Sequence, residues 1–454
     1  MQTNQKTELF ERTPIPKAVF TLAIPMVVSS LVMVLYNLAD TYFVGMLNDP
    51  IQNAAVTLAA PVLLAFNAVN NLFGTGCSSM MSRALGRKDY DTVKRSSAFG
   101  FYCSVFAGIL FSLLCSVFAP QLIRMLGADD GTYAATFDYM KWTVMCGAAP
   151  AILNVVMSYM VRAEGAAFHA SIGAMSGCIL NMILDPFFIL PWGLNMGAAG
   201  AGCATFISNC VACAYYFVLL AVKRGNTFVC ISPKWFSLRR DIVAGVCAVG
   251  IPASIQNLLN VTGMTIMNNF TAGFGADAVA AMGISYKLYM IPIQVQWGCA
   301  QGIMPLVSYN YGSGNMKRMK QSILFTIRLL VPAMAVMMLI YYMAAGPMIG
   351  AFMKNETIIA YGTRFLRGFC LGMPFMCMDF LGVNVFQALG KGKVAFVFAI
   401  LRKIVLEIPL LVVLNALFPL YGLSYAQAVT EMALAVASVV MLKRLFVRLE
   451  VKRN

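Results

Sequence analysis

Charged residues and histidine are scarce in this chain of 454 residues. Asp, Glu, Lys and Arg together make up 11% of it, hydrophobic residues make up 60%, and there is one histidine. Soluble domains typically carry about 25% charged residues, so a water-soluble fold is not expected. Polar stretches long enough to build a separate core are also missing, and we therefore expect no extramembrane domain.

Motifs of common enzymes and metal sites are missing too. The sequence contains no HExxH pattern, no GxxxxGK[ST] loop and no convincing arrangement of Ser with His. The only CxxC pair, Cys210 with Cys213, lies in an apolar run, which favours packing over metal or redox chemistry. We predict that the protein is not an enzyme, needs no cofactor and is not driven directly by ATP.

Apolar segments long enough to cross a bilayer are abundant. A membrane-spanning helix needs roughly 20 predominantly apolar residues. The predicted spans are 17–46, 54–81, 96–119, 137–161, 168–190, 197–222, 241–271, 278–308, 321–348, 360–388, 393–416 and 421–445. The sequence therefore predicts an all-α integral membrane protein with twelve transmembrane helices.

The basic residues are spread between the apolar segments. Lys and Arg number 33 against 18 Asp and Glu, but they form no single patch, so nucleic-acid binding is not expected. They gather around 83–95, 223–240, 317–320 and 443–453, whereas loops 48–50, 191–196 and 417–421 have none. By the positive-inside rule, both termini and the central linker are predicted to face the cytoplasm of a multi-pass cell-membrane protein.

An internal repeat relates the two halves of the chain. At a shift of 226, Gly76, Ser82, Gly86, Lys94 and Ser96 fall on Gly302, Ser308, Gly312, Lys320 and Ser322; at a shift of 225, Gly147, Ala163, Gly165, Gly197 and Thr205 fall on Gly372, Ala388, Gly390, Gly422 and Thr430. Because each half has an even number of spans, both copies enter the membrane in the same direction. We predict parallel six-helix lobes around a central cavity: 1–222, a cytoplasmic linker 223–240, and 241–454 with its cytoplasmic tail.

Two carboxylates lie inside apolar segments, where a charge costs at least about 2.5 to 3.5 kcal/mol on insertion scales. Asp40 ends the run Tyr36-Asn37-Leu38-Ala39-Asp40, and Asp185 lies one helical turn after Asn181. Two carboxylates and an amide converging from two helices are suited to hold a proton or a hard cation. The alternative is that these groups only hydrogen-bond the helices together.

Several motifs resemble those of one transporter family. They are IPMVVSSLVMVLYNLADTYFVG, RALGRKDYDTVKRS, the turn Arg162 to Gly165, LNMILDPFFI, GAAGAGCAT and SYNYGSGN. In order and spacing they are similar to the multidrug and toxic compound extrusion (MATE) transporters, particularly the MepA and DinF-like branch, over essentially the whole chain. The resemblance implies multidrug efflux: an antiporter that exports small, mainly cationic amphipathic compounds in exchange for H⁺ or Na⁺ by alternating access.

The resemblance also implies where the coupling ion binds. Positions matching Asp40, Asn181, Asp185 and Thr205 form the coupling-ion region of the family's amino-terminal lobe, and the only metal expected is Na⁺ at Asp40, Asn181 and Asp185. Candidate cavity or supporting residues are Tyr36, Asn37, Asn154, Gln256, Asn260, Lys287, Asp379 and Glu407. The expected partners are amphipathic small molecules and the bilayer, without an obligate protein partner.

The carboxy-terminal half departs from this pattern. Some sodium-coupled members of the family carry an acidic pair here, from the seventh and tenth helices, but the seventh helix of this chain offers Gln256 and Asn260 without a carboxylate. This moves the expected ion site to the amino-terminal lobe. Lys287, Arg402 and Lys403 either pair with Asp379 or Glu407 or extend their stems to the interface, and the sequence leaves both alternatives open.

A flippase or exporter of lipid-linked molecules on a related two-lobed fold is the rival interpretation. Such a cavity would need several basic residues for phosphate headgroups. The strongest intramembrane cluster of this chain, Asp40 with Asp185, is acidic, and this favours the antiporter.

Overall fold

The computed structural model describes residues 2–451, which form helices and connecting loops without a β-strand. A backbone in lipid must satisfy its own hydrogen bonds, and a helix does so within one segment. Within this part of the chain, eight helices are long and apolar enough to cross a membrane, and the number rises to ten when each of two bent helix pairs is taken as one span. The expected all-α membrane fold is therefore confirmed.

The helices follow in two successive sets. The first set is α1 (Gln2–Glu11), α2 (Ile15–Gly45), α3 (Pro50–Asn70), η1 (Asn71–Thr75), α4 (Gly76–Gly86), α5 (Tyr90–Val117), α6 (Ala119–Met125), α7 (Tyr133–Met140), η2 (Lys141–Cys146), α8 (Ala148–Ala163), α9 (Ala167–Ile189) and α10 (Ala198–Val222). After η3 (Pro233–Trp235), the second set is α11 (Arg240–Ala272), α12 (Ala276–Gly312), α13 (Met316–Gly350), α14 (Glu356–Cys370), α15 (Met373–Ala388), α16 (Gly392–Ile400), η4 (Leu401–Glu407), α17 (Ile408–Leu417) and α18 (Gly422–Val451).

All twelve predicted spans are helical, but several are not single regular helices. Span 54–81 comprises α3, the wide π-helical turn η1 and α4, and span 393–416 contains the π-helical turn η4. Spans 137–161 and 360–388 are bent by 47° and 48°. These bends lie just before Pro150 and Pro374. The last two predicted spans, α16 to α17 and α18, are not among the ten apolar segments.

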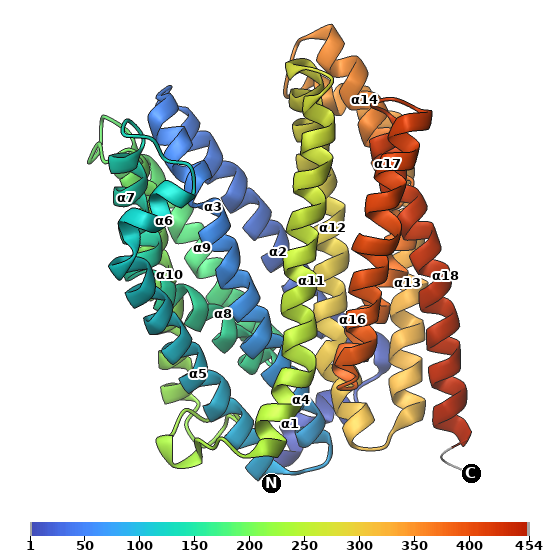
Figure 1. Cartoon of the computed structure of the whole chain (residues 1–454). Coiled ribbons are helices and arrows are strands. Elements are labelled where there is room, and N and C mark those ends of the chain that lie inside the picture. Colours follow the sequence, from blue (N-terminus) through green and yellow to red (C-terminus); the bar gives the residue numbers. More distant parts are fainter. Residues whose placement is uncertain (1, 452–454) are drawn as a thin grey trace.

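The two sets lie side by side as an amino-terminal lobe (α2–α10) and a carboxy-terminal lobe (α11–α18). Their ribbons meet near the end that carries both termini and diverge toward the opposite end (Figure 1). The finer division at 222 and 240 stays a prediction.

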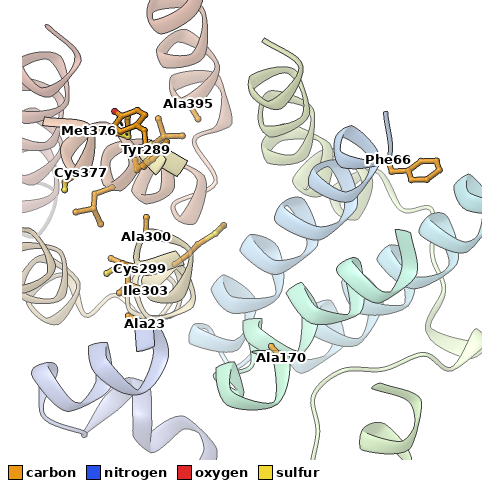
Figure 2. Close-up of a cluster of buried hydrophobic side chains, with 14 of the residues drawn as sticks. Ala23, Phe66, Ala170, Tyr289, Cys299, Ala300, Ile303, Met376, Cys377 and Ala395 are labelled. Atoms are coloured by element: carbon orange, nitrogen blue, oxygen red, sulfur yellow. Dashed lines mark hydrogen bonds between the residues drawn. The ribbon is translucent and has the colours of Figure 1, made fainter. Parts of the chain in front are cut away.

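Glycines set the closest contacts between the lobes. A Cβ on Gly86 would overlap the Tyr309 carbonyl oxygen, and a Cβ on Gly312 would overlap the Arg83 carbonyl oxygen, so α4 and α12 cross backbone to backbone. A Cβ on Gly302 would lie 2.7 Å from the Cα of Ala23 in α2. Figure 2 shows Ala23 beside Ile303 of α12. Small residues allow this approach, as is common between membrane helices.

The repeat is visible as equivalent hydrogen bonds. Ser82 Oγ donates to the Ala163 carbonyl at 2.8 Å, and its counterpart Ser308 donates to the Ala388 carbonyl at 2.9 Å. The backbone framework is therefore duplicated down to single side-chain contacts.

Candidate functional site

The acidic site of the amino-terminal lobe is built from three neighbouring helices. α2 packs against α9, and α9 packs against α10. They carry Asp40, then Asn181 with Asp185, and then Thr205. Asn181 is 2% exposed and Asp185 is 0% exposed, while Asp40 is half-buried. The carboxylates of Asp40 and Asp185 lie close enough to interact electrostatically, so the structure brings the predicted acids together.

Asn181 connects Asp185 with α10. Its amide satisfies both neighbours in one orientation, in which Nδ2 donates to Asp185 Oδ2 at 2.9 Å and the amide oxygen accepts from the Thr205 backbone N at 3.0 Å and Oγ1 at 3.1 Å. The reverse orientation would point the amide oxygen at a carboxylate. Asn181 thus fixes the position of the Asp185 side chain.

Tyr36 and Tyr139 adjoin the two carboxylates, and Asn154 makes its hydrogen bonds to other partners. Tyr36 interacts with Asp40 and Thr205, and Tyr139 of α7 lies within electrostatic range of both carboxylates. Asn154 instead donates to Asn209 Oδ1 at 2.7 Å and to a backbone carbonyl. Asn37 is exposed. Tyr36 therefore adjoins Asp40, whereas Asn154 bonds Asn209, which lies one helical turn after Thr205 on α10, and its role in the site stays a prediction.

Within the described residues, the acidic site has no basic partner. Among the described residues, no Lys or Arg forms a salt bridge with Asp40 or Asp185. Burial disfavours a charged carboxylate, and two adjacent carboxylates repel each other. A proton or a hard cation relieves both penalties, and the carboxylate, amide and hydroxyl oxygens are ligands that such a cation accepts. The residues present therefore fit the expected ion.

The carboxy-terminal lobe contains a buried network in which acids and bases are paired. Arg402 lies between two carboxylates, with Nη1 3.0 Å from Asp379 Oδ2 and Nη2 2.5 Å from Glu431 Oε1. Lys403 Nζ lies 2.6 Å from Glu407 Oε2. All five side chains are buried. The π-helical turn η4 supplies Arg402, Lys403 and Glu407, and such turns are frequent at functional sites.

A small cavity of about 130 Å³ adjoins this network and is lined by Asn260, Tyr286 and Lys403, among others. Gln256 accepts from Gln387 Nε2 at 3.3 Å.

The sequence left open which acids pair with Lys287, Arg402 and Lys403. The structure pairs Arg402 and Lys403 with acids, whereas Lys287 is exposed and forms no salt bridge within the described chain.

Two residues of these clusters were missed from the sequence. Glu431 lies inside the predicted span 421–445, so the rule that singled out Asp40 could have found it. It also directly follows Thr430, the repeat counterpart of Thr205. Tyr139 had no comparable signal, because tyrosine is ordinary in membrane helices and its approach to Asp40 is a tertiary contact.

Comparison with known proteins identifies the family. A model of the family described as MatE matches residues 25–198 and 252–413. The chain belongs to the MATE transporter family. The multidrug export protein MepA of Staphylococcus aureus (strain MRSA252) is 33% identical over 444 residues, which cover 97% of this chain and 96% of MepA. The MepA of Staphylococcus saprophyticus is 32% identical over 446 residues, 98% of this chain and 97% of that protein.

Solved structures agree with this family. An outward-facing conformation of a multidrug resistance MATE family transporter matches with a TM-score of 0.92 at 25% identity, covering 98% of this chain and 99% of the other. A MOP superfamily transporter from Pyrococcus furiosus matches with a TM-score of 0.90 at 25% identity and the same coverage. The chain is thus a multi-pass membrane transporter of a family whose members are not enzymes.

Proposed function

We propose that this MATE transporter is a secondary antiporter that exports small amphipathic, mainly cationic organic compounds in exchange for H⁺ or Na⁺ by alternating access. The observation that carries the proposal is the pair of Asp40, half-buried, and Asp185, fully buried, which lie within electrostatic range of each other and have no basic partner in the described chain. The export activity in the names of the MepA relatives supports the substrate class. The carrier resides in the cell membrane with both termini in the cytoplasm.

The acidic site is connected to the contact between the lobes through α2. Asp40 lies toward one end of this helix, and Ala23 lies near the other end, against Gly302 of α12. Pro25, inside α2, removes a helix hydrogen bond between these points. Binding of H⁺ or Na⁺ changes the charge at Asp40, and a shift of α2 transmits this change to α12. The ion drives transport because it binds the outward-open and inward-open states unequally.

The test is efflux of a fluorescent lipophilic cation from proteoliposomes under an imposed pH or Na⁺ gradient. Asp40→Asn and Asp185→Asn are compared with wild type, and Asp130→Asn is the matched control, because the Asp130 side chain is 91% exposed in a surface ion pair. The proposal predicts gradient-driven efflux in wild type and the control, and its loss in both test variants with substrate binding retained.

Efflux that persists in both test variants would place the coupling ion elsewhere. If neither gradient moves the cation even through wild type, the rival flippase or lipid-linked exporter becomes the better interpretation. Its headgroup-binding residues would then have to lie outside the acidic site.

A further inference from the structure

The end of the molecule that carries both termini contains a cavity of about 720 Å³ lined by four basic side chains, which we call the cationic cavity. Arg83 lies in the last turn of α4, and Arg87 directly follows this helix. Lys391 directly precedes α16, and Arg448 lies on α18. Among the described residues that line the cavity, none is Asp or Glu. The three arginines therefore give the cavity a positive lining that is suited to an anion.

Backbone contacts hold Arg83 in place, and no carboxylate of the described residues pairs with it. Its Nε donates to the Ser79 carbonyl at 3.1 Å. Its guanidinium lies over the backbone of Gly390, where a Cβ would overlap Nη1. In the described chain, neither Arg83, Arg87 nor Arg448 forms a salt bridge. The nearby Asp89 caps α5 by accepting from the Thr92 backbone N at 3.1 Å and also interacts electrostatically with Arg87, so it offsets part of the positive charge at the rim of the cavity.

The internal repeat shows what occupies the equivalent place in the other half. Gly165 is the counterpart of Gly390, and both have a positive φ, +89° and +74°. A Cβ on Gly165 would lie 2.8 Å from Phe10 of α1. Tyr309, the counterpart of Arg83, stacks on Phe10 and donates to Glu11 Oε1 at 2.6 Å. In the amino-terminal half, the place equivalent to the cationic cavity is thus filled by the Phe10 ring, and the neighbouring Glu11 carboxylate binds Tyr309.

A mostly apolar cavity of about 300 Å³ adjoins the cationic cavity. The two share Met316 and Leu449, and the apolar cavity continues between α13 and α18 past Leu324 and Phe446. A molecule with an anionic group for the cationic cavity and an apolar chain for the adjoining cavity would fill both spaces. Basic pockets between membrane helices near the surface are typical binding sites for phosphate headgroups of lipids.

We propose that the cationic cavity binds the phosphate headgroup of an anionic phospholipid, with an acyl chain against the adjoining apolar cavity. Arg83 and Arg87 belong to the amino-terminal lobe, and Lys391 and Arg448 belong to the carboxy-terminal lobe. A bound headgroup therefore bridges the lobes at the end where α4 and α12 cross, and it stabilises the conformation in which this end is closed.

The test measures thermal unfolding of the detergent-purified full chain during titration with short-chain phosphatidylglycerol. Phosphatidylcholine of the same chain length tests the need for charge, and glycerol phosphate and inorganic phosphate test the need for a lipid chain. The variant is Arg87→Gln with Arg448→Gln, because both side chains are exposed and their loss spares the packing. The matched control is Arg224→Gln with Lys234→Gln, two exposed basic residues that do not line the cavity.

Phosphatidylglycerol is expected to raise the unfolding midpoint of wild type and control saturably, and phosphatidylcholine is not. Loss of two basic groups is expected to raise the half-saturating concentration roughly thirtyfold in the variant. An equal response of the variant and the control would overturn the site. An equal response to glycerol phosphate and phosphatidylglycerol would overturn the lipid assignment in favour of a soluble phosphate compound.

Discussion

The two lobes share a backbone plan, but the acidic side chains inside their helices have opposite surroundings. In the amino-terminal lobe, Asp40 and Asp185 have no basic partner in the described chain; in the carboxy-terminal lobe, Arg402 and Lys403 neutralise most of the charge of three carboxylates. Paired charges need no exchangeable ion, whereas unpaired ones do. The duplication thus preserved the framework while the two copies acquired different electrostatic roles.

The largest expected effect is on transport, from loss of an unpaired acid. Asp40→Asn and Asp185→Asn are each expected to reduce gradient-driven efflux about tenfold or more, because the driving ion loses its differential binding. Glu431→Gln, in the paired network, should retain gradient dependence. Initial efflux rates in proteoliposomes, normalised to protein content, measure this contrast. Equal losses of efflux in the Asp40, Asp185 and Glu431 variants would contradict the difference between the lobes.

The next effect concerns stability. Arg402→Met leaves Asp379 and Glu431 buried without their base, and removal of one partner of a buried pair costs about 3 to 5 kcal/mol. The thermal unfolding midpoint in detergent should fall clearly. Adding Asp379→Asn and Glu431→Gln to the same chain should recover most of the loss. Asp185→Asn should lower the midpoint much less, because the charge it removes has no basic partner in the described chain and the asparagine oxygen can still accept from Asn181.

A smaller effect is expected at Gly263, where α11 meets the paired network. A Cβ there would lie 2.7 Å from Glu407 Oε1 and 2.8 Å from Lys403 Nζ. Gly263→Ala should destabilise by about 1 kcal/mol, the low end of overpacking costs, since the ends of both side chains can shift. Gly283→Ala is the control, because its Cβ would meet nothing within 4 Å. Equal midpoints for the two variants would contradict the tight fit.

The smallest effect is expected at Lys287. This residue is exposed and has no salt bridge in the described chain, so Lys287→Gln should change stability by less than about 0.5 kcal/mol. Efflux should also stay near wild type. A loss comparable to that of Arg402→Met would mean that Lys287 joins the paired network in another conformation of the transporter.

Apolar length was sufficient to predict the helical segments, because the bilayer dictates them. The wide turns η1 and η4 were not predicted, since their extra residue per turn depends on packing against neighbouring helices. The scarcity of intramembrane charge singled out Asp40 and Asp185. It could not say which acid meets which base, because the pairing of Arg402 with Glu431 is a contact between helices that are distant in the sequence.

The most direct test of the contrast between the lobes is infrared difference spectroscopy of the purified transporter during titration with H⁺ and with Na⁺. If the amino-terminal site holds the coupling ion, the carboxylate and carboxylic-acid bands that respond to the ion will be lost in Asp40→Asn and Asp185→Asn and retained in Glu431→Gln and Asp379→Asn. Bands that persist in the first two variants and vanish in the last two would place the ion in the carboxy-terminal lobe.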